Sequence, residues 1–199
     1  MAFNLDCESD KTLLEQLKSG DGDSFFLLYE RYKNRVMRFA YILLQDEEAA
    51  GDVVFNTFLW FMDFLPDDAN LLSLLLKKTR SFANALVKKS PDMEKRRKEH
   101  LERLSSSQQS QEGDFGPLLF AAFMSLSPLH RESIYLTMVE DLSYAEIGAV
   151  LECSTEEVGQ RLNEALVAMR EVLDKQGLLK KTSNTADASG GGAQDGEKV

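Results

Sequence analysis

The side chains that could perform catalysis or hold a metal are few and far apart in this sequence. Glu47, Glu48 and Asp52 are carboxylates at helical spacing, but beside an expected helix start their commonest role is to balance the helix dipole. His100 and His130 are isolated, and neither has a second metal ligand four residues away. No glycine-rich phosphate loop and no nucleophile–base arrangement occurs. We therefore expect a non-enzymatic protein with no metal and no cofactor.

Charge is strongly segregated along the chain. The net charge is −10, which is unusual for a nucleic-acid-binding protein unless its basic residues are clustered. Residues 77–103 contain ten Lys or Arg against four acidic residues, whereas residues 140–174 contain nine acidic residues against two Arg. The first segment could lie along phosphates, although a solvated helix face is the commoner explanation of a basic run. The second segment, taken as a whole, repels phosphates.

Hydrophobic periodicity predicts helices throughout, so the expected fold class is all-α. In the N-terminal half the expected helices cover residues 10–18, 24–44, 46–65 and 71–89. Pro66 and Pro91 end the last two of these, because proline cannot continue a helix. Residues 53–65 are apolar almost all round, which indicates a helix that is either fully buried or covered by a partner.

The chain is expected to form two small helical domains joined by a polar linker. The expected divisions are an N-terminal arm at 1–9, a first domain at 10–90, a linker at 91–114, a second domain at 115–176 and a disordered tail at 177–199. The linker is basic and then rich in Ser and Gln, and the tail is polar and contains a run of Gly.

Features of cellular location point to the cytoplasm. No apolar stretch is long enough to cross a membrane, and the N-terminus lacks the layout of a signal peptide. Cys7 and Cys153 lie far apart and neither belongs to a closely spaced pair, so we expect free thiols in a reducing compartment.

The second half contains the pattern of a helix-turn-helix. Ser127 and Pro128 begin one helix, and capping boxes at 143–146 and 154–157 begin two more. The short helix, tight turn and longer helix have helix-turn-helix spacing, although spacing alone fits any helical hairpin about equally well. In the longer helix the residues expected to face inward are Val158, Leu162, Ala165, Leu166 and Met169.

Two long stretches resemble one known family. The run that begins LSPLHRESIYLTMVEDLS, at 126–173, resembles region 4 of extracytoplasmic-function (ECF) sigma factors of the sigma-70 family. The run that begins LLEQLKSGDGDSFF, at 13–61, resembles their region 2, and the linker falls where that family has one. The resemblance covers roughly residues 10 to 175 and implies a protein that binds core RNA polymerase and directs it to promoters. The resemblance also makes an anti-sigma factor a candidate partner.

The resemblance implies three sets of contact residues. Those expected to contact −35 DNA from the recognition helix are Ser154, Thr155, Gln160, Arg161 and Asn163, since amides pair well with adenine. Those expected near −10 DNA are Lys77, Lys78, Arg80, Lys88 and Lys89. Those expected to bind polymerase are Asp52, Phe55, Asn56 and Leu59.

The sequence departs from the family pattern at several of these positions. Phe55 and Asn56 stand where the family has Gln and an acid, and Leu74, Ser81 and Ala85 replace its Trp, Asn and Asp. In the recognition helix Gly159 and Glu164 occupy positions that are usually basic, which lowers the expected gain from counterion release. At the preceding turn Glu152 replaces a frequent Gly.

These departures keep alternative functions open. The leading hypothesis is an ECF sigma factor that binds core polymerase and promoter DNA. The rival is a sigma-like mimic or regulator that binds an anti-sigma factor or polymerase without recognising DNA, as the acidic 140–174 segment and the apolar 53–65 helix would suit. A dimeric helix-turn-helix repressor or activator is a third and weaker possibility.

Overall fold

The described part of the chain consists of α-helices and the turns between them. The computed structural model describes residues 8–67, 70–90 and 116–175, together with residues 92, 95, 96, 99 and 102. The helices are α1 (Asp10–Lys18), α2 (Gly22–Leu44), α3 (Glu47–Phe64), α4 (Leu71–Lys89), α6 (Gly116–Ser125), α7 (Pro128–Met138), α8 (Tyr144–Leu151) and α9 (Thr155–Lys175). The predicted all-α class is confirmed, and none of the described helices is long and apolar enough to cross a membrane.

Short polar side chains cap the starts of α2 and α3. Asp21 accepts a hydrogen bond from the backbone N–H of Asp23 at the start of α2, and Asp46 accepts one from Ala49 at the start of α3. These bonds satisfy N–H groups that have no partner within the helix. At the other end of α3, Leu65 adopts a left-handed backbone with φ of 36°, and Pro66 follows it.

Helices α1 to α4 pack together around one apolar core. α2 contacts α1, α3 and α4, and α3 also packs against α4. Phe39, Phe61 and Leu75 are fully buried between them. Asp10 in the first turn of α1 pairs with Arg31 and accepts a hydrogen bond from the Tyr32 hydroxyl of α2. Burial, together with this bond to a carboxylate, raises the pKa of the Tyr32 phenol.

Helices α6 to α9 form a second packed group. α9 packs against α6, α7 and α8, with Ala165 fully buried and Val158 buried near its start. Leu162 and Met169 are half-buried. The expectation that Leu166 faces inward is wrong, because 43% of this residue is exposed. The buried stripe of α9 is therefore narrower than the spacing of its apolar residues suggested.

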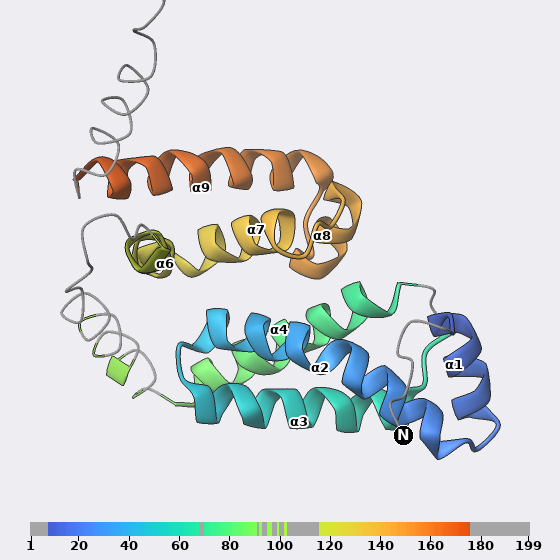
Figure 1. Cartoon of the computed structure of the whole chain (residues 1–199). Coiled ribbons are helices and arrows are strands. Elements are labelled where there is room, and N and C mark those ends of the chain that lie inside the picture. Colours follow the sequence, from blue (N-terminus) through green and yellow to red (C-terminus); the bar gives the residue numbers. More distant parts are fainter. Residues whose placement is uncertain are drawn as a thin grey trace, which may run out of the picture.

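The two groups of helices lie against each other (Figure 1). α4 contacts α8 and α2 contacts α7, and the rings of Phe39 and Tyr135 stack with their centroids 5.7 Å apart. The core is continuous from α2 and α4 into α7 and α8. Most of the predicted linker at 91–114, residues 1–7 of the predicted arm and the tail at 177–199 lie outside the described residues. The domain boundaries therefore stay predictions.

One face of α3 is left uncovered. Of its apolar side chains, Phe55, Leu59, Met62 and Phe64 are each at least two-fifths exposed, while Val53, Phe58 and Phe61 are buried against α2 and α4. The alternative that this helix is fully buried is therefore wrong for the described residues, because only one side of it meets other helices. The alternative of a covering partner stays a prediction.

Candidate nucleic-acid and protein-binding surfaces

Both predicted capping boxes are present in the helix-turn-helix. Ser143 Oγ accepts the N–H of Glu146 at 3.3 Å, and Glu146 Oε2 accepts the N–H of Ser143 at 2.7 Å. Ser154 and Glu157 make the same reciprocal pair at 3.2 and 2.8 Å. Hydrogen bonds from the two serines lower the pKa of the Glu146 and Glu157 carboxyls from their usual range. The starts of α8 and α9 are thereby fixed by local bonds.

The turn between α8 and α9 is tight. Glu152 adopts the left-handed conformation with φ of 58°, which costs a residue with a side chain on the order of 1 kcal/mol. The N–H of Cys153 donates to the Gly148 carbonyl at 3.0 Å. A Cβ atom at Gly148 would lie only 2.7 Å from the Cys153 carbonyl oxygen. A side chain at position 148 would therefore force this turn to shift.

Four of the five predicted −35 residues lie exposed along the start and first turns of α9. Ser154, Thr155, Gln160 and Asn163 are exposed, and Arg161 is half-buried. The side-chain amide of Gln160 donates to Glu164 Oε1 at 2.9 Å. A carboxylate therefore holds one of the amides that the sequence predicted to contact bases.

The basic side chains predicted for −10 DNA lie along α4, and part of this set is already engaged. Arg80 Nε donates to Glu132 Oε2 of α7 at 2.7 Å, and Lys77 pairs with Glu152 at 3.2 Å. Lys78 lies over the Trp60 ring, with Nζ 4.7 Å from its centroid. Lys88 and Lys89, which are exposed at the end of α4, complete the predicted set.

A hollow of about 530 Å³ lies where α4 meets α8. Trp60 of α3 forms one wall and Val150 of α8 another. Its polar lining residues are Lys77, Lys78, Arg80, Ser81, Asn84, Lys88 and Glu152. The hollow is therefore cationic on the α4 side and carries one carboxylate on the α8 side.

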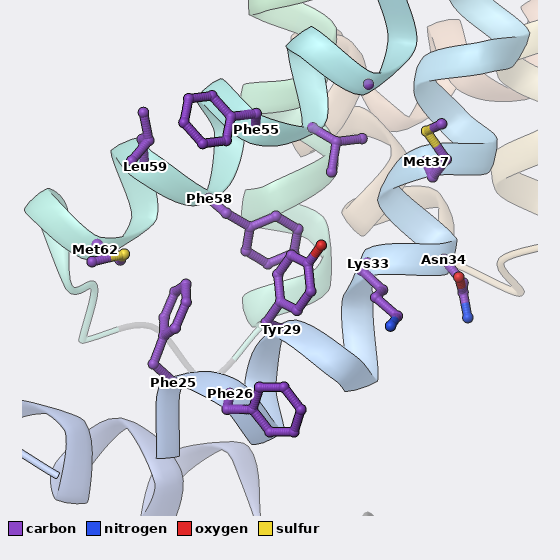
Figure 2. Close-up of a pocket in the computed structure, with 12 residues that line it drawn as sticks. Phe25, Phe26, Tyr29, Lys33, Asn34, Met37, Phe55, Phe58, Leu59 and Met62 are labelled. Atoms are coloured by element: carbon purple, nitrogen blue, oxygen red, sulfur yellow. The ribbon is translucent and has the colours of Figure 1, made fainter. Parts of the chain in front are cut away.

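An apolar groove of about 630 Å³ runs between α2 and α3 (Figure 2). Phe25, Phe26 and Tyr29 of α2 face Phe55 and Leu59 of α3 across it. The Tyr29 ring meets the Phe58 ring edge-on, with centroids 4.8 Å apart, which fixes the floor of the groove. Lys33 supplies a positive charge at the rim, 5.6 Å from the Tyr29 centroid.

The four predicted polymerase-binding residues share the exposed side of α3, but only two of them line the groove. Phe55, 65% exposed, and Leu59 are lining residues. Asp52 and Asn56 are exposed, and the Asn56 amide donates to the Asp52 carbonyl within the helix. The α2 wall of the groove, which includes Phe25 and Tyr29, was not among the residues predicted from the sequence. The signal that could have identified this wall is the adjacent pair Phe25 and Phe26, which places apolar rings on two sides of one helix.

Comparison with known proteins identifies the C-terminal part. Residues 122–171 match the family Sigma-70, region 4. This part of the chain is a sigma-70 region 4 domain. The match runs from the second half of α6 to near the end of α9, so the helix-turn-helix described above is that of region 4. No curated protein sequence matches the chain significantly.

Among solved structures, two share the fold of most of the chain and not of region 4 alone. CnrH, in complex with the cytosolic domain of CnrY, has a TM-score of 0.63 and 22% identity over 84% of this chain and 99% of CnrH. The sigma factor RpoE in complex with the anti-sigma factor NepR, from Bartonella quintana, has a TM-score of 0.56 and 22% identity over 75% of this chain and 96% of RpoE.

Among the described residues, no three His, Cys, Asp or Glu side chains converge as a metal site would require. The described surfaces carry groups suited to recognition. Region 4 offers amides and Arg161 on α9, α4 offers a row of cations, and the α2–α3 groove offers apolar area.

Proposed function

We propose that the chain is an ECF-type sigma factor that binds core RNA polymerase and directs promoter-specific initiation. The observation that carries this proposal is the combination of a region 4 helix-turn-helix with a two-part helical fold like that of the sigma factor RpoE. The role requires recognition of a protein and of DNA, and no catalysis by the chain itself. Because its partner is the transcription machinery, we place its action in the cytoplasm.

The α2–α3 groove is the proposed polymerase-binding surface. Its exposed walls, Phe55 and Leu59 on one side and Phe26 on the other, suit the apolar face of a helix laid into the groove. The rings of Tyr29 and Phe58 are already packed, so a helix that binds there meets a preformed floor. Phe55 replaces the family's Gln, and we propose that apolar contact takes over from a hydrogen bond at this position.

DNA recognition is assigned to α9 and α4. In region 4, Thr155, Gln160 and Asn163 are exposed donors and acceptors that could contact base edges, and Arg161 could pair with a guanine or a phosphate. On α4, the row from Lys77 to Lys89 could follow the backbone of −10 DNA. RpoE, whose fold this chain shares, was solved in complex with the anti-sigma factor NepR. On that likeness we propose an anti-sigma factor as a further partner.

Co-purification with core RNA polymerase, followed by binding of the complex to fork-junction promoter DNA over a salt series, tests the proposal. The double variant Phe55→Ser and Leu59→Ser is expected to weaken binding to core polymerase about 30-fold or more, because exposed apolar anchors dominate such interfaces. The matched control is Phe64→Ser, since Phe64 is similarly exposed on the same helix but does not line the groove.

The outcomes of this experiment are clear-cut. The control should stay within about threefold of wild type in polymerase affinity. Equal losses in the control and the double variant would show that the groove is not the binding surface. Failure of the folded wild-type chain to bind core polymerase at all would overturn the proposed function.

A second role is favoured by one observation, the bond that Glu164 makes to Gln160 on the recognition helix. A carboxylate on that surface repels phosphates and holds an amide needed for base contacts. The chain would then be a sigma-like regulator that binds polymerase or an anti-sigma factor without recognising DNA.

The substitution Glu164→Arg separates the two roles. If region 4 binds DNA, this change should strengthen non-specific duplex binding about threefold or more, because it replaces repulsion by a phosphate contact. The matched control is Glu171→Arg, at an exposed position later on the same helix. Fluorescence anisotropy with a labelled duplex provides the measurement. An equal response of both variants would favour the regulator.

A further inference from the structure

The hollow of about 530 Å³ where α4 meets α8, called the α4–α8 hollow from here on, is positive in a protein that is acidic as a whole. Among the described residues, its lining contains one carboxylate, Glu152, against four cations: Lys77, Lys78, Arg80 and Lys88. The net charge of the chain is −10. A hollow of this size is typical of sites for single small molecules, and its charge favours an anion.

Several positions at which the sequence departs from the family pattern meet in this hollow. Leu74, Ser81 and Ala85, which stand where the family has Trp, Asn and Asp, line its α4 side. Glu152, which replaces a frequent Gly, lines it at the end of α8. Leu and Ala are smaller than Trp and Asp, and the loss of Asp also removes a negative charge. The space and the charge of the hollow therefore depend on residues particular to this chain.

Two of the four cations are available to bind an anion. Lys77 and Arg80 are each paired with a carboxylate. Lys78 and Lys88 have no carboxylate partner in the part of the chain that the structure describes. These two are ten residues apart on α4, which is about 15 Å along the helix axis. An elongated anion such as a chain of phosphates therefore suits this spacing better than a single small ion does.

An aromatic surface lies beside these cations. Trp60 of α3 forms one wall of the hollow, and its ring stacks on Phe64 with centroids 5.0 Å apart, which holds the indole in place. The Lys78 ammonium lies 4.7 Å from the centroid of the Trp60 ring. If Lys78 turns toward a phosphate, it uncovers a ring face on which a base can stack. Val150 of α8 provides a second apolar wall.

Glu152 supplies a group that a site for phosphate alone would not need, because a carboxylate repels phosphates. Its ion pair with Lys77 uses Oε1, and Oε2 makes no hydrogen bond or ion pair with the other described residues. A carboxylate that accepts hydrogen bonds from ribose hydroxyls is a feature of nucleotide sites. The backbone of Glu152 is left-handed, with φ of 58°, and such strain is often found at functional sites.

We propose that the α4–α8 hollow binds a ribonucleoside polyphosphate. The base stacks on Trp60, the ribose hydroxyls donate to Glu152, and the phosphates bind Lys78 and Lys88. Ser81 and Asn84, both exposed on α4 between the two lysines, supply neutral donors along the phosphate chain.

Binding of the nucleotide does not depend on the proposed sigma-factor role, but one consequence does. Lys78 and Lys88 also belong to the set proposed for −10 DNA, so a bound nucleotide would compete with DNA for the same side chains. The chain's affinity for DNA would then fall as the nucleotide concentration rises.

Isothermal titration calorimetry of the full chain tests the proposal with ATP and GTP, their 2′-deoxy forms, inorganic tripolyphosphate and a single-stranded oligothymidylate. We expect at least one ribonucleotide to bind about tenfold or more tightly than tripolyphosphate, because only the nucleotide has a base to stack. It should bind about three- to tenfold more tightly than its 2′-deoxy form, which lacks one hydroxyl for Glu152. Trp60, the only tryptophan, reports the place of binding, since a stacked base quenches its fluorescence.

The variant Glu152→Gly removes the carboxylate and relieves the left-handed strain, so folding is not put at risk. It should lose the preference for the ribonucleotide over the 2′-deoxy form. The control Glu171→Gln, which removes the same charge at an exposed position of α9, should keep that preference. Lys88→Gln should weaken ribonucleotide and tripolyphosphate binding alike, about two- to fivefold relative to Lys175→Gln at an exposed position of α9.

Four outcomes would overturn the proposal. Equal affinity for tripolyphosphate and the nucleotides would show an anion-binding surface only. Nucleotide binding without quenching of Trp60 would place the site elsewhere, and an unchanged ribose preference in Glu152→Gly would remove the assigned role of Glu152. Binding of oligothymidylate but of no mononucleotide would assign the hollow to DNA alone. Polymerase binding enters none of these measurements, so failure of the proposed function is recognised separately.

Discussion

Replacing Gly148 by alanine is expected to destabilise region 4 by about 1–3 kcal/mol and to change the angle between α8 and α9. The added Cβ would lie 2.7 Å from the Cys153 carbonyl oxygen, which is backbone and cannot rotate away. Separating them stretches the Cys153-to-Gly148 hydrogen bond that closes the turn. Urea unfolding followed by circular dichroism measures the loss of stability.

Gly159→Ala is the matched control for this substitution. The nearest atom to a Cβ at Gly159 is Tyr144 Cε2 at 3.6 Å, an ordinary contact, and the position lies inside α9. Alanine there should stabilise the helix by up to about 1 kcal/mol. If Gly148→Ala also proved neutral or stabilising, the close approach in the turn would not be the determinant of this geometry.

Replacing Arg131 by methionine is expected to cost about 3 kcal/mol of stability. Arg131 is 1% exposed, and its Nη1 donates to the carbonyls of Met124 and Leu126 at 2.7 and 2.6 Å. These carbonyls lie at and just beyond the end of α6, where a helix has no further N–H groups to bond them. Methionine has a similar volume but no hydrogen-bond donor. The carbonyl oxygens of Met124 and Leu126 would therefore lose their charged donor.

The effect of Arg131 should extend to the contact between the two helical groups. The Met124 carbonyl also accepts a hydrogen bond from the Gln45 amide, at the end of α2, at 3.1 Å. Thermal unfolding and Trp60 quenching of Arg131→Met can therefore be compared with Arg170→Met, a substitution at an exposed position of α9 that should change stability by less than about 0.5 kcal/mol. Equal stability of the two variants would contradict the assigned role of Arg131.

Local features of this protein were predictable because they depend on neighbours in sequence. Helical periodicity located α1 and α4 to the residue, and the Ser–Glu spacing predicted the capping boxes of α8 and α9. A tight turn before α9 was predicted from the short gap between two helices, whereas the left-handed backbone of Glu152 was found in the structure. Each of these depends on contacts within about five residues, where backbone geometry leaves few alternatives.

Prediction was weaker wherever a residue's surroundings came from another helix. The apolar spacing of α9 placed Leu166 inward, although the neighbouring helices cover only a narrower stripe. The groove was recognised only by its α3 wall, because periodicity says that a residue is apolar and on one face but not which helix lies opposite.

Sequence alone was enough to predict an all-α chain, the helix-turn-helix with its caps, and two segments of opposite charge. The packing of the two helical groups brings these segments into contact at one pair, Lys77 and Glu152. The same packing pairs Arg80 with Glu132 and Arg35 with Glu140. The partners in these pairs are separated by 52 and 105 residues in the chain. Their pairing depends on the orientation of the two helical groups relative to each other. No local sequence pattern encodes that orientation.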